Sequence, residues 1–164
     1  MPRSFGNRFV VLLLSLFASQ TWANVSTGAG DPTCAKNYIT LRKGPGAQYP
    51  ISWRVAKYMP FLRQESKNGW VKVQDLEGEI HWAQGKDLSS GLHCVVVRAA
   101  IATLRKEPST TAPMAEIKTL DRYTPLKKLE MKDDWVKVED ETGRQAWIHD
   151  SNVWRPMKVQ SMSF

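Results

Sequence analysis

The sequence predicts an all-β protein in which two tandem, small five-stranded barrels pack together. The block WVKVQD at residues 70–75, followed by a Gly and a Trp, returns as WVKVED at residues 135–140, again followed by a Gly and a Trp. Within each block apolar and polar residues alternate, as they do in a half-buried β-strand. The mature chain has no stretch with the apolar spacing of a helix. A repeat of this kind decides the architecture before any motif is considered.

The first residues predict export rather than a packed element. Residues 1–23 read as a cleaved signal peptide, with Arg3 and Arg8 before the apolar run Phe9–Phe17 and a small-x-small site at Thr21–Ala23. That apolar run is too short to cross a bilayer as a helix. We therefore expect no membrane span in the mature form and a periplasmic or secreted bacterial protein.

The first repeat follows a polar segment rich in small residues, residues 24–33, which is expected to be a flexible leader. We place the first domain at residues 34–92. Its predicted strands are separated by turns that contain Gly, Pro or Asn, and they cover Tyr38–Leu41, Ile51–Val55, Phe61–Gln64, Trp70–Gln74 and Ile80–Ala83.

The second repeat keeps the same order over residues 93–157. Thr103–Pro108 matches Thr40–Pro45, and later prolines match once a short insertion is allowed. Cys94–Val97 is a β-branched run that either adds a first strand or pairs across the domain junction. Residues 158–164 show no pattern and are expected to fray. Each repeat has about 60 residues, a size at which a lone core is marginal, so the two should pack on each other.

Composition narrows the possible partners. The chain is 42% hydrophobic and 24% charged, with a formal net charge of +7. Export and the lack of a dense Lys/Arg cluster argue against nucleic acid. A modest, spread positive charge suits loose attraction to acidic envelope polymers, lipid headgroups or proteins.

The two cysteines, Cys34 and Cys94, both lie in the exported part. An even number of cysteines in an oxidising compartment predicts a disulfide, which here would enclose nearly all of the first repeat. Two reduced thiols are the alternative.

The motifs resemble a known family. The series TLRKGPGAQYPISW, then Pro60, then GWVKVQDLEGEIHWAQGKDLS resembles a bacterial SH3-type (SH3b) domain, and TLRKEPSTTAP with DWVKVEDETGRQAWIHDSNVW resembles a divergent copy. The resemblance covers about residues 35–155 and implies a tandem SH3-like, exported binding protein.

Several positions depart from the family pattern. Glu107 stands where the first repeat has Gly44, and Val136 stands where many relatives carry a Cys. The acidic loop of eukaryotic signalling SH3 domains is replaced by the basic residues Arg42 and Lys43. Recognition of Arg-flanked PxxP peptides is therefore not expected.

No enzyme is expected from these residues. SH3b domains often accompany Cys–His peptidase domains, but the sequence shows no such catalytic domain. Candidate nucleophiles would be Cys34 or Cys94 with one of the three histidines, yet the adjacent His93 and Cys94 point to opposite faces of a strand. The scattered histidines have no paired ligand spacing, so neither a metal nor another cofactor is predicted.

The aromatic residues are the better site candidates. In each WVKV strand the Trp and the Lys share one face while the two Val share the other, so Trp70 and Trp135 should lie on an outer face or rim if the Val pair faces the core. There a Trp can stack on a sugar or a peptide side chain, or else pack against the neighbouring repeat. Trp82 and Trp147 are expected in the core. The ligand-binding candidates are Arg42, Tyr49, Trp53, Trp70, Lys72 and Trp135.

The sequence thus leads to two main functional hypotheses and to a third, least favoured one, a Cys/His hydrolase. The first is a non-enzymatic envelope module that binds a cell-wall (peptidoglycan) peptide or a periplasmic protein segment in a groove of the first repeat, with Arg42 and Lys72 meeting carboxylates. The second is a scaffold or interaction protein without a small ligand, joined by its partner at an exposed strand edge.

Overall fold

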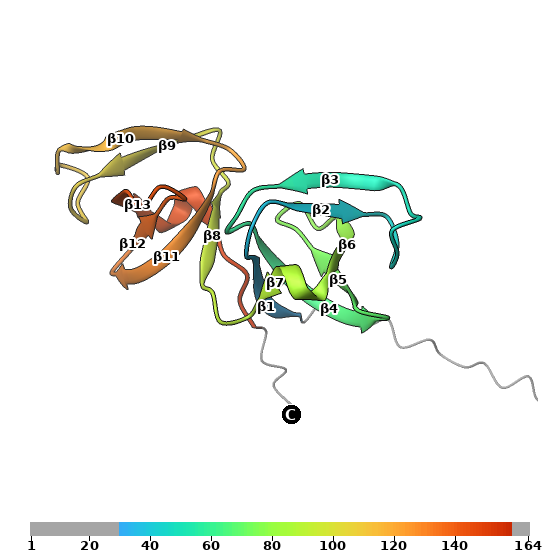
Figure 1. Cartoon of the computed structure of the whole chain (residues 1–164). Helices are drawn as coiled ribbons and strands as arrows, with labels where there is room; N and C mark the ends of the chain where they lie inside the picture. Colours follow the sequence, from blue (N-terminus) through green and yellow to red (C-terminus); the bar gives the residue numbers. More distant parts are fainter. Residues whose placement is uncertain (1–29, 159–164) are drawn as a thin grey trace, which may run out of the picture.

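Figure 1 shows the computed structural model of the chain, which describes residues 30–158. Two lobes lie side by side, and each is a bent, antiparallel 7-stranded sheet with one short 3₁₀ helix. The predicted signal peptide, the first part of the predicted leader and the tail beyond Lys158 lie outside the described residues. The predicted all-β class and the two packed β-units are confirmed.

The first lobe has the strand order β3-β2-β6-β5-β4-β1-β7. Its elements are β1 (Asp31–Ala35), β2 (Ile39–Arg42), β3 (Ile51–Val55), β4 (Pro60–Lys67), β5 (Trp70–Gln74), β6 (Ile80–Gln84), the 3₁₀ helix η1 (Gly85–Asp87) and β7 (Leu88–Ser89). The second lobe has the matching order β10-β9-β13-β12-β11-β8-β14. Its elements are β8 (Cys94–Val97), β9 (Ile101–Arg105), β10 (Met114–Asp121), β11 (Pro125–Lys132), β12 (Trp135–Glu139), β13 (Gln145–His149), η2 (Asp150–Asn152) and β14 (Val153–Trp154).

Each lobe contains two strands more than the five predicted. Cys94–Val97 is the first strand of its sheet, one of the two roles expected for it. The predicted flexible leader needs correction, because its last residues, Asp31–Thr33, already belong to β1 and pair with β4. Polar composition alone suggested a loop there. Pairing with β4 satisfies the backbone groups of β1, and the side chain of Thr33 is buried.

The WVKV strands form the central hairpins of the two lobes. In both strands the two Val residues are buried: Val71 and Val73 on β5, and Val136 and Val138 on β12. The Trp and Lys that alternate with them are half-buried. The predicted alternation is therefore correct. The turn of each hairpin contains a glycine in the left-handed region: Gly78 has φ 84° in the first lobe, and Gly143 has φ 89° in the second.

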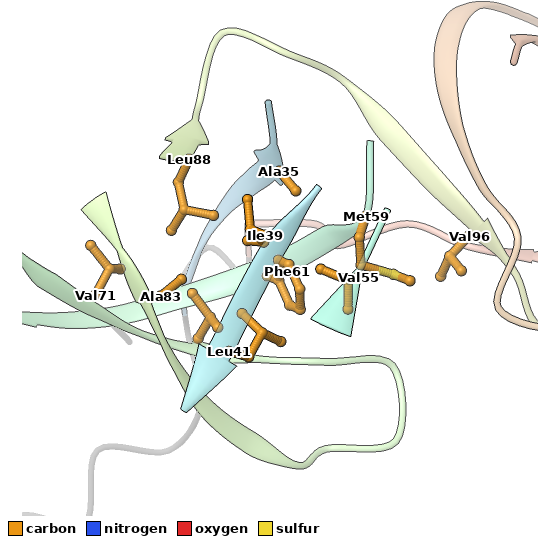
Figure 2. Packing of buried hydrophobic residues seen from close by; sticks show 11 residues of the cluster. Ala35, Ile39, Leu41, Val55, Met59, Phe61, Val71, Ala83, Leu88 and Val96 are labelled. Atoms are coloured by element: carbon orange, nitrogen blue, oxygen red, sulfur yellow. The ribbon is translucent and has the colours of Figure 1, made fainter. Parts of the chain in front are cut away.

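Each lobe has its own hydrophobic core, and two residues of the second sheet, Val96 and Trp154, pack in or against the first. Figure 2 shows Phe61 and Leu41 in the centre of the first cluster, together with Val55 and Met59. Val96, which comes from β8 of the second sheet, belongs to this first cluster and has no exposed surface. The second cluster contains Val95, Val97, Ala102, Leu104, Ala115, Leu126, Val136, Val138, Ala146, Ile148 and Val153.

A covalent bond and buried packing hold the junction. Cys34 on β1 and Cys94 on β8 form the predicted disulfide, with their Cα atoms 6.2 Å apart. Tyr58 and Leu92 pack against the bridge. The alternation of neighbours on β8 explains this arrangement, since Val95 and Val97 point into the second core while Val96 faces the first. Among the residues described, no helix has the length and apolar character to span a bilayer.

Candidate ligand-binding groove

A groove of about 360 Å³ opens at the junction of the lobes. The first lobe supplies most of its lining, and the second lobe supplies one tyrosine. The lining residues are Ser52, Trp53, Asp75, Glu77, Glu79, His81 and Tyr123. Most ligand sites combine an apolar surface with a few convergent polar groups in a concave place, and this groove does so.

Trp53 provides the aromatic wall of the groove. It lies on β3, the end strand of the first sheet, and its side chain is half-buried. Its ring meets Tyr123 edge-on, with centroids 6.0 Å apart, and lies 6.1 Å from the ring of His81. Edge-to-face contacts at this distance hold an aromatic ring in a defined orientation. A ligand would therefore meet a positioned Trp face.

The floor of the groove is a chain of polar side chains. Ser52 Oγ lies 2.9 Å from His81 Nδ1, and His81 Nε2 lies 3.3 Å from Asp75 Oδ2. His81 is 5% exposed and Asp75 is 8% exposed. The other oxygen of Asp75 accepts the backbone N–H groups of Glu77 and Glu79, each at 2.9 Å. Asp75 thus shapes the β5–β6 turn and anchors the histidine.

The second lobe does not carry this chain. The central hairpins have the same register, which places Ala146 where the first lobe has His81. On the end strands, Met114 pairs with Arg105 as Ile51 pairs with Arg42, so Ala115 follows where the first lobe has Ser52, before a longer irregularity in β10. Both alanines are buried in the second core. The fold therefore does not require the Ser–His pair, and the polar floor is a property of the first lobe alone.

An ion pair across the junction lies beside the groove, because its carboxylate, that of Glu77, is one of the lining groups. Arg122 donates to Glu77 through Nη2, and Tyr123 donates its hydroxyl to the same carboxylate over 3.0 Å. The hydrogen bond from Arg122 is the main cause that lowers the pKa of Glu77, and the same bond raises the pKa of Arg122. The second lobe thus contributes both an aromatic ring and a charge to the site.

Tyr123 also has an unusual backbone conformation. Its φ is 68°, and the equivalent Tyr58 of the first lobe has φ 70°. A bulky residue with positive φ is a strained conformation that its surroundings must hold. Tyr58 packs beneath the disulfide, whereas Tyr123 packs against Trp53. One turn position therefore serves the junction in both repeats.

The predicted residues Arg42 and Tyr49 meet, but they do so within the first long loop. Arg42 Nη1 donates to the backbone carbonyl of Tyr49 over 2.7 Å, and Arg105 makes the same bond to Ala112 in the second lobe. This arginine closes its own loop in both repeats.

The other predicted residues lie on the hairpins. Lys72 forms an ion pair with Glu65 at 3.9 Å, and Trp135 meets His149 edge-on at 5.3 Å. Trp70 begins β5 and pairs in register with Lys67. Of the six predicted binding residues, the groove at the junction contains Trp53.

Six lining residues were not among the predicted site residues: Ser52, Asp75, His81, Glu77, Glu79 and Tyr123. The sequence held one signal for the first three, because Ser52 and His81 differ together from their repeat-two equivalents while Asp75 is retained as Asp140. No such signal marks Tyr123. Tyr123 reaches the groove because the lobes pack in one particular way.

The two predicted core tryptophans differ. Trp82 is buried as expected, whereas Trp147 is half-buried with Lys137 Nζ 6.0 Å from its ring centroid. Both cysteines are in the disulfide, so neither thiol of Cys34 or Cys94 is free to act as a nucleophile.

Comparison with known proteins identifies the repeats. The bacterial SH3 domain family matches twice, over residues 35–90 and 98–155. No curated protein matches the chain. Similar solved structures include NlpC2 from Trichomonas vaginalis (13% identity, TM-score 0.35, covering 80% of this chain and 50% of that one). NlpC1 from Trichomonas vaginalis is another, with 14% identity and a TM-score of 0.36, covering 82% of this chain and 49% of that one. A third is an NlpC/P60 family protein from Bacillus cereus, with 16% identity and a TM-score of 0.35, covering 76% of this chain and 56% of that one. The chain spans about half the length of these structures.

Proposed function

Because the chain belongs to the bacterial SH3 domain family, we propose that it is a non-enzymatic binding module of the cell envelope that holds a cell-wall peptide in the groove at Trp53. Tandem domains of this family together with a disulfide fit an extracellular or periplasmic binding protein. The finer statement, that the ligand is a peptide of the wall and that the groove is its site, is the proposal.

The observation that carries this proposal is the positioned Trp53 face in a groove at the lobe junction. A second cavity of about 410 Å³ also includes Tyr123 in its lining, so the two adjoin at this residue. The second cavity adds Tyr38 and Pro125, and Tyr38 is 71% exposed. Two adjoining grooves with aromatic walls suit an extended ligand such as a peptide better than a single small molecule.

Co-sedimentation with purified peptidoglycan tests the proposal. Truncation of an aromatic anchor in a binding site commonly costs 2 kcal/mol or more, so Trp53→Ala should weaken binding at least about tenfold. Trp70→Ala is the matched control, because it removes the same side chain from the edge of the hairpin. Equal binding by wild type and Trp53→Ala, with both folded, would exclude this groove as the site.

A second candidate function is a scaffold role without a small ligand. Among the residues that the structure describes, the end strands β3 and β10 pair with a neighbour along one edge only, and each has an exposed apolar residue, Ile51 and Met114. A partner strand can add to such an edge. Failure of every wall fraction to pull down the protein, combined with one stable partner protein from envelope extract, would favour this role.

A further inference from the structure

We propose that the groove receives a primary ammonium group carried on a peptide side chain, with Trp53 against its methylene stem and Glu79 facing its charge. This inference rests on the proposed binding function and names the chemical group that the groove selects. Three carboxylates line the groove, those of Asp75, Glu77 and Glu79, although the chain as a whole carries a formal charge of +7. The three carboxylates would therefore attract a cation to this place even though the chain as a whole is positively charged.

The second repeat shows which group belongs at this turn. There Arg144 follows the turn aspartate Asp140, and its guanidinium binds the Asp140 carboxylate, with Nε 2.9 Å and Nη2 2.8 Å from Oδ2. Burial raises the pKa of Asp140, but hydrogen bonds from Thr142 and Arg144 outweigh this effect and leave the pKa lowered. The second lobe thus fills its own turn with a cation.

The first lobe has the opposite charge at the same position. Asp75 N–H donates to the backbone carbonyl of Glu79, as Asp140 N–H does to that of Arg144, so the two positions are equivalent. A carboxylate therefore stands where the second lobe has a guanidinium. Within residues 30–158, the side chain of Glu79 takes part in no hydrogen bond or ion pair. A ligand cation would restore the pairing that the second lobe makes internally.

The geometry favours an ammonium over a guanidinium. Glu77 is already bound by Arg122 and Tyr123, and both oxygens of Asp75 already have partners. Arg122 and Tyr123 both bind Oε1 of Glu77, so Oε2 of Glu77 can still accept, but among the three groove carboxylates only that of Glu79, at the exposed rim, has no hydrogen bond or ion pair within the described residues. A guanidinium gains most from a planar, two-point fit, whereas an ammonium is a compact point charge that one carboxylate can hold.

Trp53 adds a second reason for this ligand. A cation within about 6 Å of a Trp ring is attracted to its face. The methylene stem of a lysine-type side chain can also lie along an aromatic surface while its charged end stays near water. The second lobe has no aromatic residue on the equivalent strand β10. The aromatic face and the unpaired carboxylate therefore occur together in the first lobe.

A peptide titration followed by nuclear magnetic resonance tests the inference on the whole mature protein. The probe is the blocked tripeptide Ala-Lys-Ala, and the comparison is the same peptide with its lysine Nε acetylated. We expect the lysine peptide to shift the Trp53 indole N–H signal and the acetylated peptide to bind at least about tenfold more weakly. Equal binding of both peptides, or no shift of the Trp53 signal by either, would overturn the inference.

Charge variants sharpen the result. Glu79→Gln should weaken lysine-peptide binding several-fold, and Glu79→Arg, which copies the second lobe, should abolish it. Glu116→Gln, an exposed glutamate on β10 outside the groove, is the matched control and should bind like wild type. A Glu79→Arg variant that binds as well as the control would contradict the proposal.

Peptidoglycan with its free amines acetylated separates this inference from the proposed function. Binding to untreated wall that falls after acetylation supports both. Binding that survives acetylation leaves the wall function standing and contradicts the ammonium site. A protein that binds the lysine peptide at Trp53 but no wall preparation would keep the ammonium site and overturn the wall function.

Discussion

Tyr49 and Gly44 share one space in the first long loop. A Cβ placed on Gly44 would come within 2.3 Å of the Tyr49 ring, so this glycine is required by its neighbour rather than by its own φ. The second repeat has Glu107 and Ala112 at these positions. The departure from the family pattern at Glu107 is therefore matched by loss of the tyrosine, and the two changes belong together.

The coupling between these two positions is testable by a double-mutant cycle. Gly44→Glu should destabilise the loop because it displaces the Tyr49 ring, whereas Gly44→Glu with Tyr49→Ala reproduces the second repeat and should recover much of the loss. We expect a coupling free energy of about 1 kcal/mol, within the range for residues in contact. Urea unfolding measures it, and strictly additive effects would show that the shared space is unimportant.

Asp75 should be important for stability as well as for the groove. Asp75→Ala leaves two backbone N–H groups and His81 without their acceptor, which should lower the free energy of unfolding by about 1 to 3 kcal/mol. Ser52→Ala with His81→Ala reproduces the second lobe and should cost less. Thermal and urea unfolding of the variants compare the two, and a reversed order would contradict the assigned role of Asp75.

At the scale of elements, β1 and β8 are the strands that make two sheets into one body. β1 pairs with β4 and β7 of its own sheet, and its Cys34 reaches Cys94 at the start of β8. The bridge spans a sequence separation of 60 residues. A cross-link over a loop of this size restricts the unfolded chain strongly.

Replacement of the disulfide should therefore cost stability without changing the fold of either sheet. Cys34→Ser with Cys94→Ser is expected to lower the free energy of unfolding by about 4 kcal/mol in the chain-entropy account. Denaturant unfolding of the variant and of the chemically reduced wild type should agree. A loss much below about 1 kcal/mol would mean that the unfolded chain is already restricted in other ways.

At the scale of the whole molecule, the second lobe completes the first. Val96 fills part of the first core, Tyr123 contacts Trp53, and Arg122 binds Glu77. These contacts come from β8 and from the turn before β11. The groove therefore exists only when both lobes are folded and docked.

Val96→Ala tests the shared core. The change removes buried methyl groups from the first cluster, so unfolding should become easier by about 2 kcal/mol. Because the lobes share this residue, both should unfold in one transition in wild type and in the variant. Fluorescence and circular dichroism transitions that separate in the wild type would show that the lobes unfold independently.

The ion pair at the junction predicts a pH dependence. Arg122 lowers the pKa of Glu77 in the folded state, so its contribution is fully present above the ordinary glutamate value of 4.5 and is lost as the pH falls through the lowered value. The difference in melting temperature between wild type and Glu77→Gln should thus be constant near neutral pH and shrink in acid. A difference that grows with acidification would contradict this sign.

The sequence by itself determined the class, the number of units and the hairpin faces. Alternation in WVKV specifies which side chains are buried, because the strand repeat of two residues is a local property. The sequence did not reveal that Asp31–Thr33 belong to β1, because a polar segment becomes a strand only when a neighbouring strand offers hydrogen bonds.

Only the tertiary structure decided where the groove lies. Trp53 could be named from the sequence, but its partner Tyr123 lies far along the chain and reaches it through the packing of two sheets. Local patterns report the face of a strand, whereas a site between lobes depends on how β8 docks against the first core. That docking is set by buried contacts and by the Cys34–Cys94 bridge. The sequence pattern could suggest the bridge, but it could not give the orientation of one lobe relative to the other.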